Sequence, residues 1–148
     1  MPTPSSHTRW TRVRTVVNWL NLSTPTGLLI ARLGGARIVP AGRGTLLATQ
    51  YRWRFPVASA FTVGSVIISR HDEQWFARRP RLVAHEDRHV TQYAWSLGVL
   101  LVPMYMVSMA VSWLLAGDQS SFNVHERLAG LEDGGYRRRP LRFARPHR

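Results

Sequence analysis

The chain has 148 residues, of which 45% are hydrophobic, which is enough for one domain with a buried core. It contains no cysteine, so disulfide bonds and thiolate metal ligands are excluded. The 20 basic residues, all of them arginine, outweigh 8 acidic residues and give a formal charge of +12, so the surface is expected to attract anionic lipid or nucleic acid.

The first predicted element is a helix from Thr8 to Leu20. Trp10, Val13, Val17 and Leu20 recur at helical spacing, while the arginines of this segment lie largely off that stripe. Such a helix either lies on a membrane surface or covers the core with its apolar face, and both alternatives stay open. The apolar part is too short for a signal peptide and lacks a cleavage site, so we expect the cytoplasmic face of a membrane rather than secretion.

Residues 22–69 are predicted to form short elements followed by two strands. Glycine and proline break residues 22–44 into short pieces. From Thr49 to Phe55 large apolar and polar side chains alternate, which predicts a half-buried strand that ends at Pro56. The run from Phe61 to Ser69, rich in Val and Ile, is its predicted partner. We therefore expect an antiparallel hairpin or meander, either as core sheet or as an edge that binds extended substrate.

The next predicted element is a helix that carries the pattern HExxH. Pro80 suits the first helical position, and no helix breaker follows until Gly98. Residues 85–89 read His-Glu-Asp-Arg-His and lie within this helix.

The helical spacing of this motif predicts a metal site. His85 and His89 lie on one face, about 6 Å apart, and can bind one tetrahedral ion, while Glu86 can act as a general base beside it. Gln92 continues the same polar stripe. The alternative is a solvated face with two surface histidines.

An uncharged apolar run follows from Leu97 to Leu115. A helix of this length is about 28 Å long, close to the roughly 30 Å of a bilayer core, so hydropathy alone predicts a transmembrane helix. Gly98 and Pro103 interrupt the run, and arginines flank both ends, so no orientation follows. The alternative is an apolar helical hairpin that folds near Pro103 and packs in a core or dips into the membrane.

A catalytic zinc site needs a third protein ligand, which we expect to be Glu126. His125 is the alternative ligand or a donor to an oxyanion. A single membrane crossing would separate Glu126 from His89, so the complete site requires the chain to turn back near Pro103.

Glu126 and His71 also have simpler interpretations. Asn123 precedes Glu126 by three residues, as in a capping box, so the Glu126 carboxylate has an alternative role as a cap at the start of its own helix. His71 is interpreted as a turn residue.

The C-terminal end is predicted to be a basic tail. Residues 137–148 contain six arginines and are expected to be disordered or bound to the surface of a single domain that covers residues 1–136.

Three segments together resemble a family of small actinobacterial HExxH proteins, similar in turn to gluzincin-like zinc metallopeptidase domains. The segments are Phe61–Ile68, Leu82–Tyr93 and Asn123–Leu131. The resemblance implies an α+β, zincin-like fold, with His85, His89 and Glu126 as ligands of Zn²⁺ and Glu86 as the general base. It departs at Gly130, where thermolysin-like enzymes have an aspartate that supports a zinc-bound histidine, so the supporting group is left unidentified.

Two functions are consistent with these patterns. The first is a membrane-associated, zinc-dependent peptidase or related hydrolase that acts on a peptide or protein; its oxyanion donor would be Tyr93, Tyr105, His125 or Tyr136. The second is a non-catalytic membrane-associated protein with a structural metal site or polar cluster. Both predict contact with an anionic membrane surface. No specific nucleic-acid partner is expected, because the arginines cluster at the ends without a recognition module.

Overall fold

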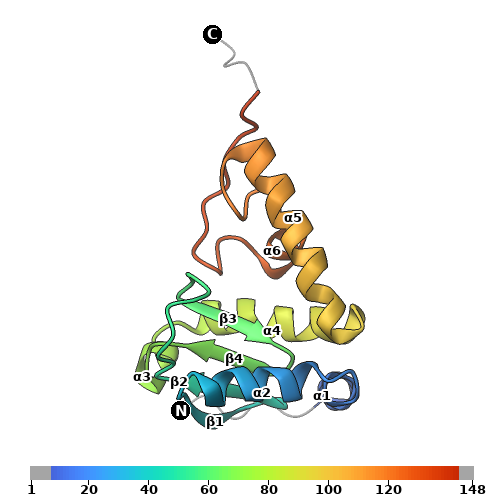
Figure 1. Ribbon diagram of the computed structural model, residues 1–148, viewed down its shortest axis with the longest axis vertical. Helices are drawn as coiled ribbons and strands as arrows, with labels where there is room; N and C mark the ends of the chain where they lie inside the picture. The colour runs from blue at the N-terminus through green and yellow to red at the C-terminus, as the bar shows by residue number, and fades with distance from the viewer. Residues whose placement is uncertain (1–7, 144–148) are drawn as a thin grey trace.

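The computed structural model describes residues 8–143 and is an α+β fold, as predicted. Its helices are α1 (Arg9–Leu20), α2 (Ser23–Leu33), α3 (Glu73–Ala77), α4 (Pro80–Trp95), α5 (Leu101–Ala116) and α6 (Val124–Ala129), with a short 3-10 turn η1 (Gly98–Leu100) before α5. The strands are β1 (Arg37–Gly42), β2 (Thr45–Thr49), β3 (Ala60–Val63) and β4 (Val66–Ser69). Figure 1 shows the sheet with α1 to α4 as one body, from which α5 projects with α6 and the C-terminal segment beside it.

The four strands form one mixed sheet in the order β1-β2-β4-β3. The outer pairs are antiparallel and the central pair, β2 with β4, is parallel. Strand β4 is buried along its whole length: Val66 and Ile68 belong to the cluster under α2, and Ile67 belongs to the cluster under α3 and α4. Helices therefore cover both faces of the sheet, and the second cluster fixes α4 on it.

An antiparallel hairpin precedes the motif helix, as predicted, but its strands differ from the predicted ones. Residues 50–59, including the alternating stretch to Phe55, form no strand, because Gln50 takes a left-handed conformation (φ 59°) that ends β2. The run from Phe61 to Ser69 is itself the hairpin of β3 and β4. Its turn needs glycine at Gly64, where φ is +62° and a Cβ atom would lie 2.3 Å from the backbone nitrogen of Thr24.

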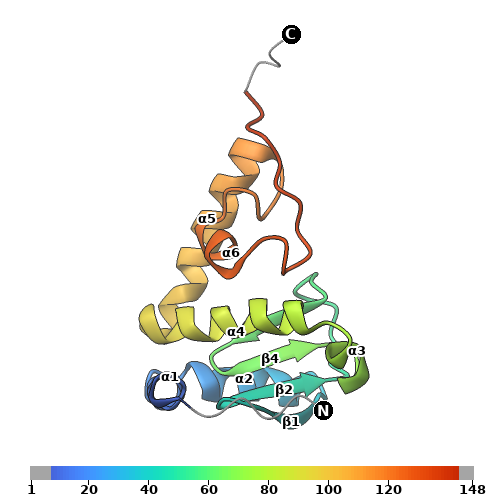
Figure 2. The ribbon, with the colours of Figure 1, turned by 180° about the vertical axis from the view of Figure 1, so that it is seen from behind.

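The prediction of a helical hairpin folded near Pro103 is also wrong. Helix α5 is continuous, and Pro103 lies in its first turn, where a missing N–H group breaks no helical hydrogen bond. The chain reverses instead at Leu97 and Gly98, both with positive φ, and again at Gly117, the left-handed C-cap of α5. Residues 117–142 then return beside α5 (Figures 1 and 2).

Candidate metal centre

The motif lies in the middle of α4, as predicted. The two residues between Glu86 and His89 attach that helix to its neighbours. Asp87 accepts hydrogen bonds from the buried Arg14 of α1 (Nη1 to Oδ2, 3.0 Å) and from Thr45 of β2 (3.1 Å). Arg88 donates to the carbonyl oxygen of Ala129 at the end of α6 and to Asp133 (2.8 Å). The motif helix is therefore fixed to α1 on one side and to α6 on the other.

The structure brings His85, His89 and Glu126 together into one buried group. Their Nε2 and carboxylate oxygen atoms all lie within 4.8 Å of one another. The two Nε2 atoms are 3.1 Å apart, Nε2 of His85 is 3.2 Å from Glu126 Oε2, and Nε2 of His89 is 3.7 Å from Glu126 Oε1. Donor atoms of a tetrahedral zinc ion, at bond lengths of about 2.0–2.1 Å, lie about 3.3 Å apart. The group therefore has the size of one metal site.

Each imidazole presents Nε2 to the centre because its Nδ1 atom has another partner. Nδ1 of His85 lies 2.9 Å from the carbonyl oxygen of Gly130, and Nδ1 of His89 lies 3.0 Å from Oε1 of Gln92. The amide of Gln92 donates to the carbonyl of His125 (2.9 Å), which orients its oxygen toward His89. Because an oxygen of this kind only accepts, each Nδ1 atom donates to its partner, and each Nε2 atom is left directed at Glu126, where it can bind a cation once any proton on it is lost.

The supporting group that the sequence left unidentified is thus the backbone of Gly130 itself. The carbonyl oxygen at this position contacts Nδ1 of His85, so no carboxylate side chain is needed there. Sequence patterns do not show such a contact, because every residue has a carbonyl group. The role of Gln92, by contrast, follows from its position three residues after His89.

The carboxylate of Glu126 belongs to the ligand group and does not cap the N-terminus of α6. The N–H group of Asn123 bonds the carbonyl of Ser120 (3.1 Å), and the side chain of Asn123 accepts from the N–H group of His125 (3.0 Å). The Oε1 atom of Glu126 accepts from the hydroxyl of Tyr105 in α5, while Oε2 is buried, lies 3.2 Å from Nε2 of His85 and accepts no hydrogen bond of acceptable geometry among residues 8–143. Burial alone would raise the pKa of Glu126, but His85, His89 and Tyr105 hold that pKa well below its usual range. A buried, ionised carboxylate beside two imidazoles suits a cation.

Glu86 lies outside the ligand group and contacts the sheet. Its carboxylate accepts a hydrogen bond from Thr62 of β3 (2.6 Å), a residue that the motif does not reveal. Burial raises the pKa of Glu86, while the nearby imidazoles and Thr62 oppose that change. A buried carboxyl group with a raised pKa is typical of a group that exchanges protons.

His125 and His71 lie outside the ligand group. The ring of His125 packs near that of Tyr105, with centroids 6.0 Å apart, and His71 stacks on Trp75 at 4.1 Å beyond the end of β4. Among the predicted oxyanion donors, Tyr105 bonds Glu126 and the ring of Tyr136 lies 6.1 Å from that of His85.

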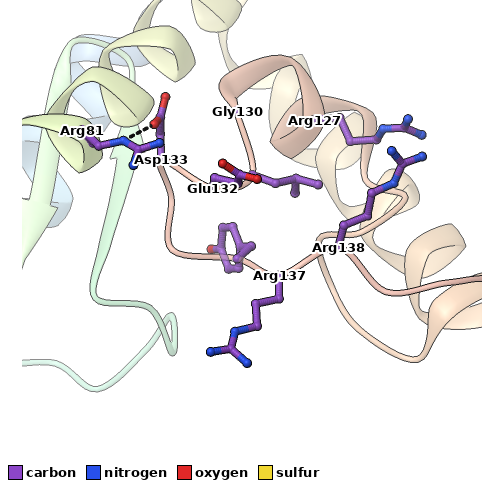
Figure 3. Close-up of a pocket in the computed structure, with 9 residues that line it drawn as sticks. Arg81, Arg127, Gly130, Glu132, Asp133, Arg137 and Arg138 are labelled. Atoms are coloured by element: carbon purple, nitrogen blue, oxygen red, sulfur yellow. Dashed lines mark hydrogen bonds and ion pairs between the residues drawn. The ribbon is translucent and has the colours of Figure 1, made fainter.

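The segment from Gly130 to Tyr136 covers the centre. A Cβ atom at Gly134 would lie 2.6 Å from Cε1 of His85, so this position rests directly on the ligand ring. Asp133 fixes the segment to α4 through Arg81 (2.8 Å) and Arg88 (2.8 Å). On its outer side is a cavity of about 570 Å³ whose lining includes Gly130 and Tyr136 (Figure 3). This volume falls in the roughly 300–1,000 Å³ range of small-molecule sites.

The basic segment after residue 136 follows the return path along α5. The N–H group of Arg139 donates to Ser121 (2.7 Å) and that of Arg142 to the carbonyl of Leu115 (2.7 Å). Up to residue 142 this part of the predicted tail therefore lies on the surface, and residues 144–148 fall outside the described part.

Comparison of the chain with protein-family models, with curated proteins and with solved structures found no match. The resemblance to HExxH and gluzincin-like proteins therefore stays a prediction. What the structure supports directly is the buried group of two histidines and one glutamate that could hold a metal ion.

We expect Gln92→Leu to weaken metal binding by about 10- to 100-fold, because the ring of His89 loses the acceptor that orients it. Competition with a chromogenic zinc chelator measures the affinity. Gln74→Leu, on α3, is the matched control and should bind as the wild type does. Equal affinity in Gln92→Leu would show that this amide does not support the site.

Proposed function

We propose that this protein is a metal-dependent hydrolase that uses zinc and cleaves an amide or peptide bond. The observation that carries the proposal is the convergence of three atoms that can each bind a cation, the two Nε2 atoms and Oε2 of Glu126, on one buried point. A proton between two of these atoms would form a hydrogen bond that involves only that pair, whereas a divalent cation can bind all three. Two histidines with one carboxylate form a set that leaves zinc one position open for catalysis.

The residues around the centre support a hydrolytic role. Zinc held there would supply Lewis acidity and lower the pKa of water. Glu86 directly follows the ligand His85, and its raised pKa suits it to take a proton from water and pass it to a leaving amine. Thr62 orients the Glu86 carboxylate. Tyr136, whose ring lies 6.1 Å from that of His85 and which also lines the cavity, is the best placed donor to a developing oxyanion.

The burial of the centre favours a second candidate, a structural metal site without catalysis. His85 and Glu126 are only 1% and 2% exposed, and the segment from Gly130 to Tyr136 lies over them. Structural zinc sites are closed, whereas catalytic sites keep an open position. For hydrolysis, this segment has to move away from His85, and the exposed ion pairs of Asp133 are the contacts that would break.

Metal removal and return distinguish the two candidates. We expect the protein to cleave members of a quenched-fluorescent peptide library, to lose that activity with 1,10-phenanthroline, and to regain it with about one equivalent of Zn²⁺. Activity that persists without metal would contradict the hydrolase proposal. A protein that binds zinc and melts at a lower temperature without it, but cleaves nothing, would have a structural site instead.

A further inference from the structure

Helix α1 has its polar side turned inward and its apolar side turned outward. Its buried residues are Thr11, Arg14 and Asn18, of which Arg14 and Asn18 bond Asp87 and Val90 of α4. Its large apolar side chains are exposed except Val17, which is partly buried; Val16 is 56% and Leu20 78% exposed. A helix on a water-soluble protein shows the opposite arrangement. The predicted apolar stripe is therefore real, but it covers no core.

Helix α5 also has an uncovered apolar side. Tyr105 bonds Glu126 of α6 and Ser112 bonds the return segment, whereas the exposed residues of this helix are all apolar. Residues 98–116 have a mean hydropathy of 2.0, and only 17% of this window is buried. An apolar helix that is not covered by its own chain needs another apolar environment.

The two outward faces are continuous with each other. Trp10 of α1 stacks on Trp95 at the end of α4, with ring centroids 5.5 Å apart, and Asn21 after α1 lies against Gly98 of η1. Both views place α1 and the base of α5 at the same side of the molecule (Figures 1 and 2). We define the apolar surface as the exposed apolar side chains of α1, of residues 95–100 and of α5.

Charge and aromatic residues indicate lipid as the occupant of this surface. The exposed Arg9 and Arg12 adjoin it on α1, and the chain carries a formal charge of +12, which opposes association with a second copy and favours an anionic bilayer. Trp10, Trp95 and Trp113 are exposed on the surface, and tryptophan is enriched where a membrane meets water.

The return segment argues against a perpendicular span of α5. Asp118, Arg127 and Arg139 lie on the stretch that packs beside α5 and would enter the hydrocarbon with it. A helix that lies in the plane of the interface avoids this cost, because only its outward face is immersed.

We propose that the apolar surface inserts into one leaflet of an anionic bilayer, with α1 and α5 both lying in the membrane plane. The polar face of α1 then stays bound to α4 through Arg14, so the metal helix is held close to the lipid. The proposal does not depend on hydrolytic activity, and its readout is binding to lipid.

Vesicle flotation of the full chain tests this proposal. We expect the wild type to float with vesicles of phosphatidylcholine and phosphatidylglycerol, and less with phosphatidylcholine alone. The double variants V13D/V16D and V107D/V111D should bind at least about tenfold more weakly, because they place charge on the inserted face. Their melting temperatures should stay near that of the wild type, since these side chains are exposed.

Val57→Asp is the matched control, because Val57 is 83% exposed and belongs to the loop between β2 and β3, a segment that lies on the side of the body opposite α1 (Figures 1 and 2). It should float as the wild type does. Equal flotation of all variants would overturn the proposal. A stable dimer without lipid that V107D/V111D dissociates would also overturn it, in favour of a second copy.

Insertion depth gives a second measurement, because the chain has no cysteine of its own. Spin labels at V16C and V107C should both become accessible to oxygen and shielded from a water-soluble nickel chelate on vesicles, at similar shallow depth. A label at V57C should stay in water. A V107C label at the bilayer centre with V16C in water would indicate a single span and contradict the proposal.

Discussion

Glu86→Gln should leave metal binding unchanged and lower hydrolysis by several orders of magnitude. The amide keeps the size of the side chain and can still accept a hydrogen bond from Thr62, but it cannot take a proton from water. Glu86 is not a member of the ligand group, so the affinity for zinc should not fall with the rate.

Turnover of the best library peptide and zinc content, both at one protein concentration, measure this separation. Glu73→Gln, a half-exposed carboxylate on α3, serves as the control and should keep full activity. If Glu86→Gln were as active as the wild type, the motif would not be catalytic, and the structural-site candidate would be favoured.

Arg14→Met should destabilise the fold by about 3 kcal/mol, because it leaves the carboxylate of Asp87 without its buried partner. Arg14 is 1% exposed and bonds Asp87 and Thr91. In the variant, Asp87 still has Arg43, which is 3.7 Å away and partly exposed. We therefore expect a loss of folding free energy at the lower end of the range for a broken buried ion pair.

Urea denaturation gives this free energy. Arg12→Met, an exposed arginine of the same helix, should change stability by less than about 0.5 kcal/mol. The double variant R14M/D87L should recover much of the loss, since it removes both charges. A large loss in Arg12→Met, or none in Arg14→Met, would contradict the role given to this ion pair.

The candidate site follows from the sequence to a considerable extent. Spacing on one helix predicts that His85, Glu86 and His89 lie together, and this depends only on the geometry of a single helix. The need for a third ligand predicts Glu126, and the structure places its carboxylate beside both histidines, although the predicted route of the chain is wrong. Pro103 predicts a bend but lies in the first turn of α5, and the actual reversals lie at Leu97 and Gly117.

The remaining features depend on tertiary contacts that leave no local pattern. The carbonyl of Gly130 and the hydroxyl of Thr62 are ordinary groups until the fold brings them to the motif. The alternating stretch ending at Phe55 has the period of a strand, yet Gln50 turns the chain out of the sheet. For α1, periodicity predicts an apolar face but not which face is turned inward, and the partner that decides this is Asp87 on a distant helix.

The metal content of the protein tests the central claim most directly. Protein purified without a histidine tag or chelator, given excess Zn²⁺ and dialysed, should retain about one zinc per chain by inductively coupled plasma mass spectrometry. His85→Ala and Glu126→Ala should retain almost none, whereas His71→Ala, a histidine outside the group, should retain as much as the wild type. A wild-type protein that comes out of dialysis free of metal, or a His85→Ala variant that binds as much zinc as His71→Ala, would contradict the account.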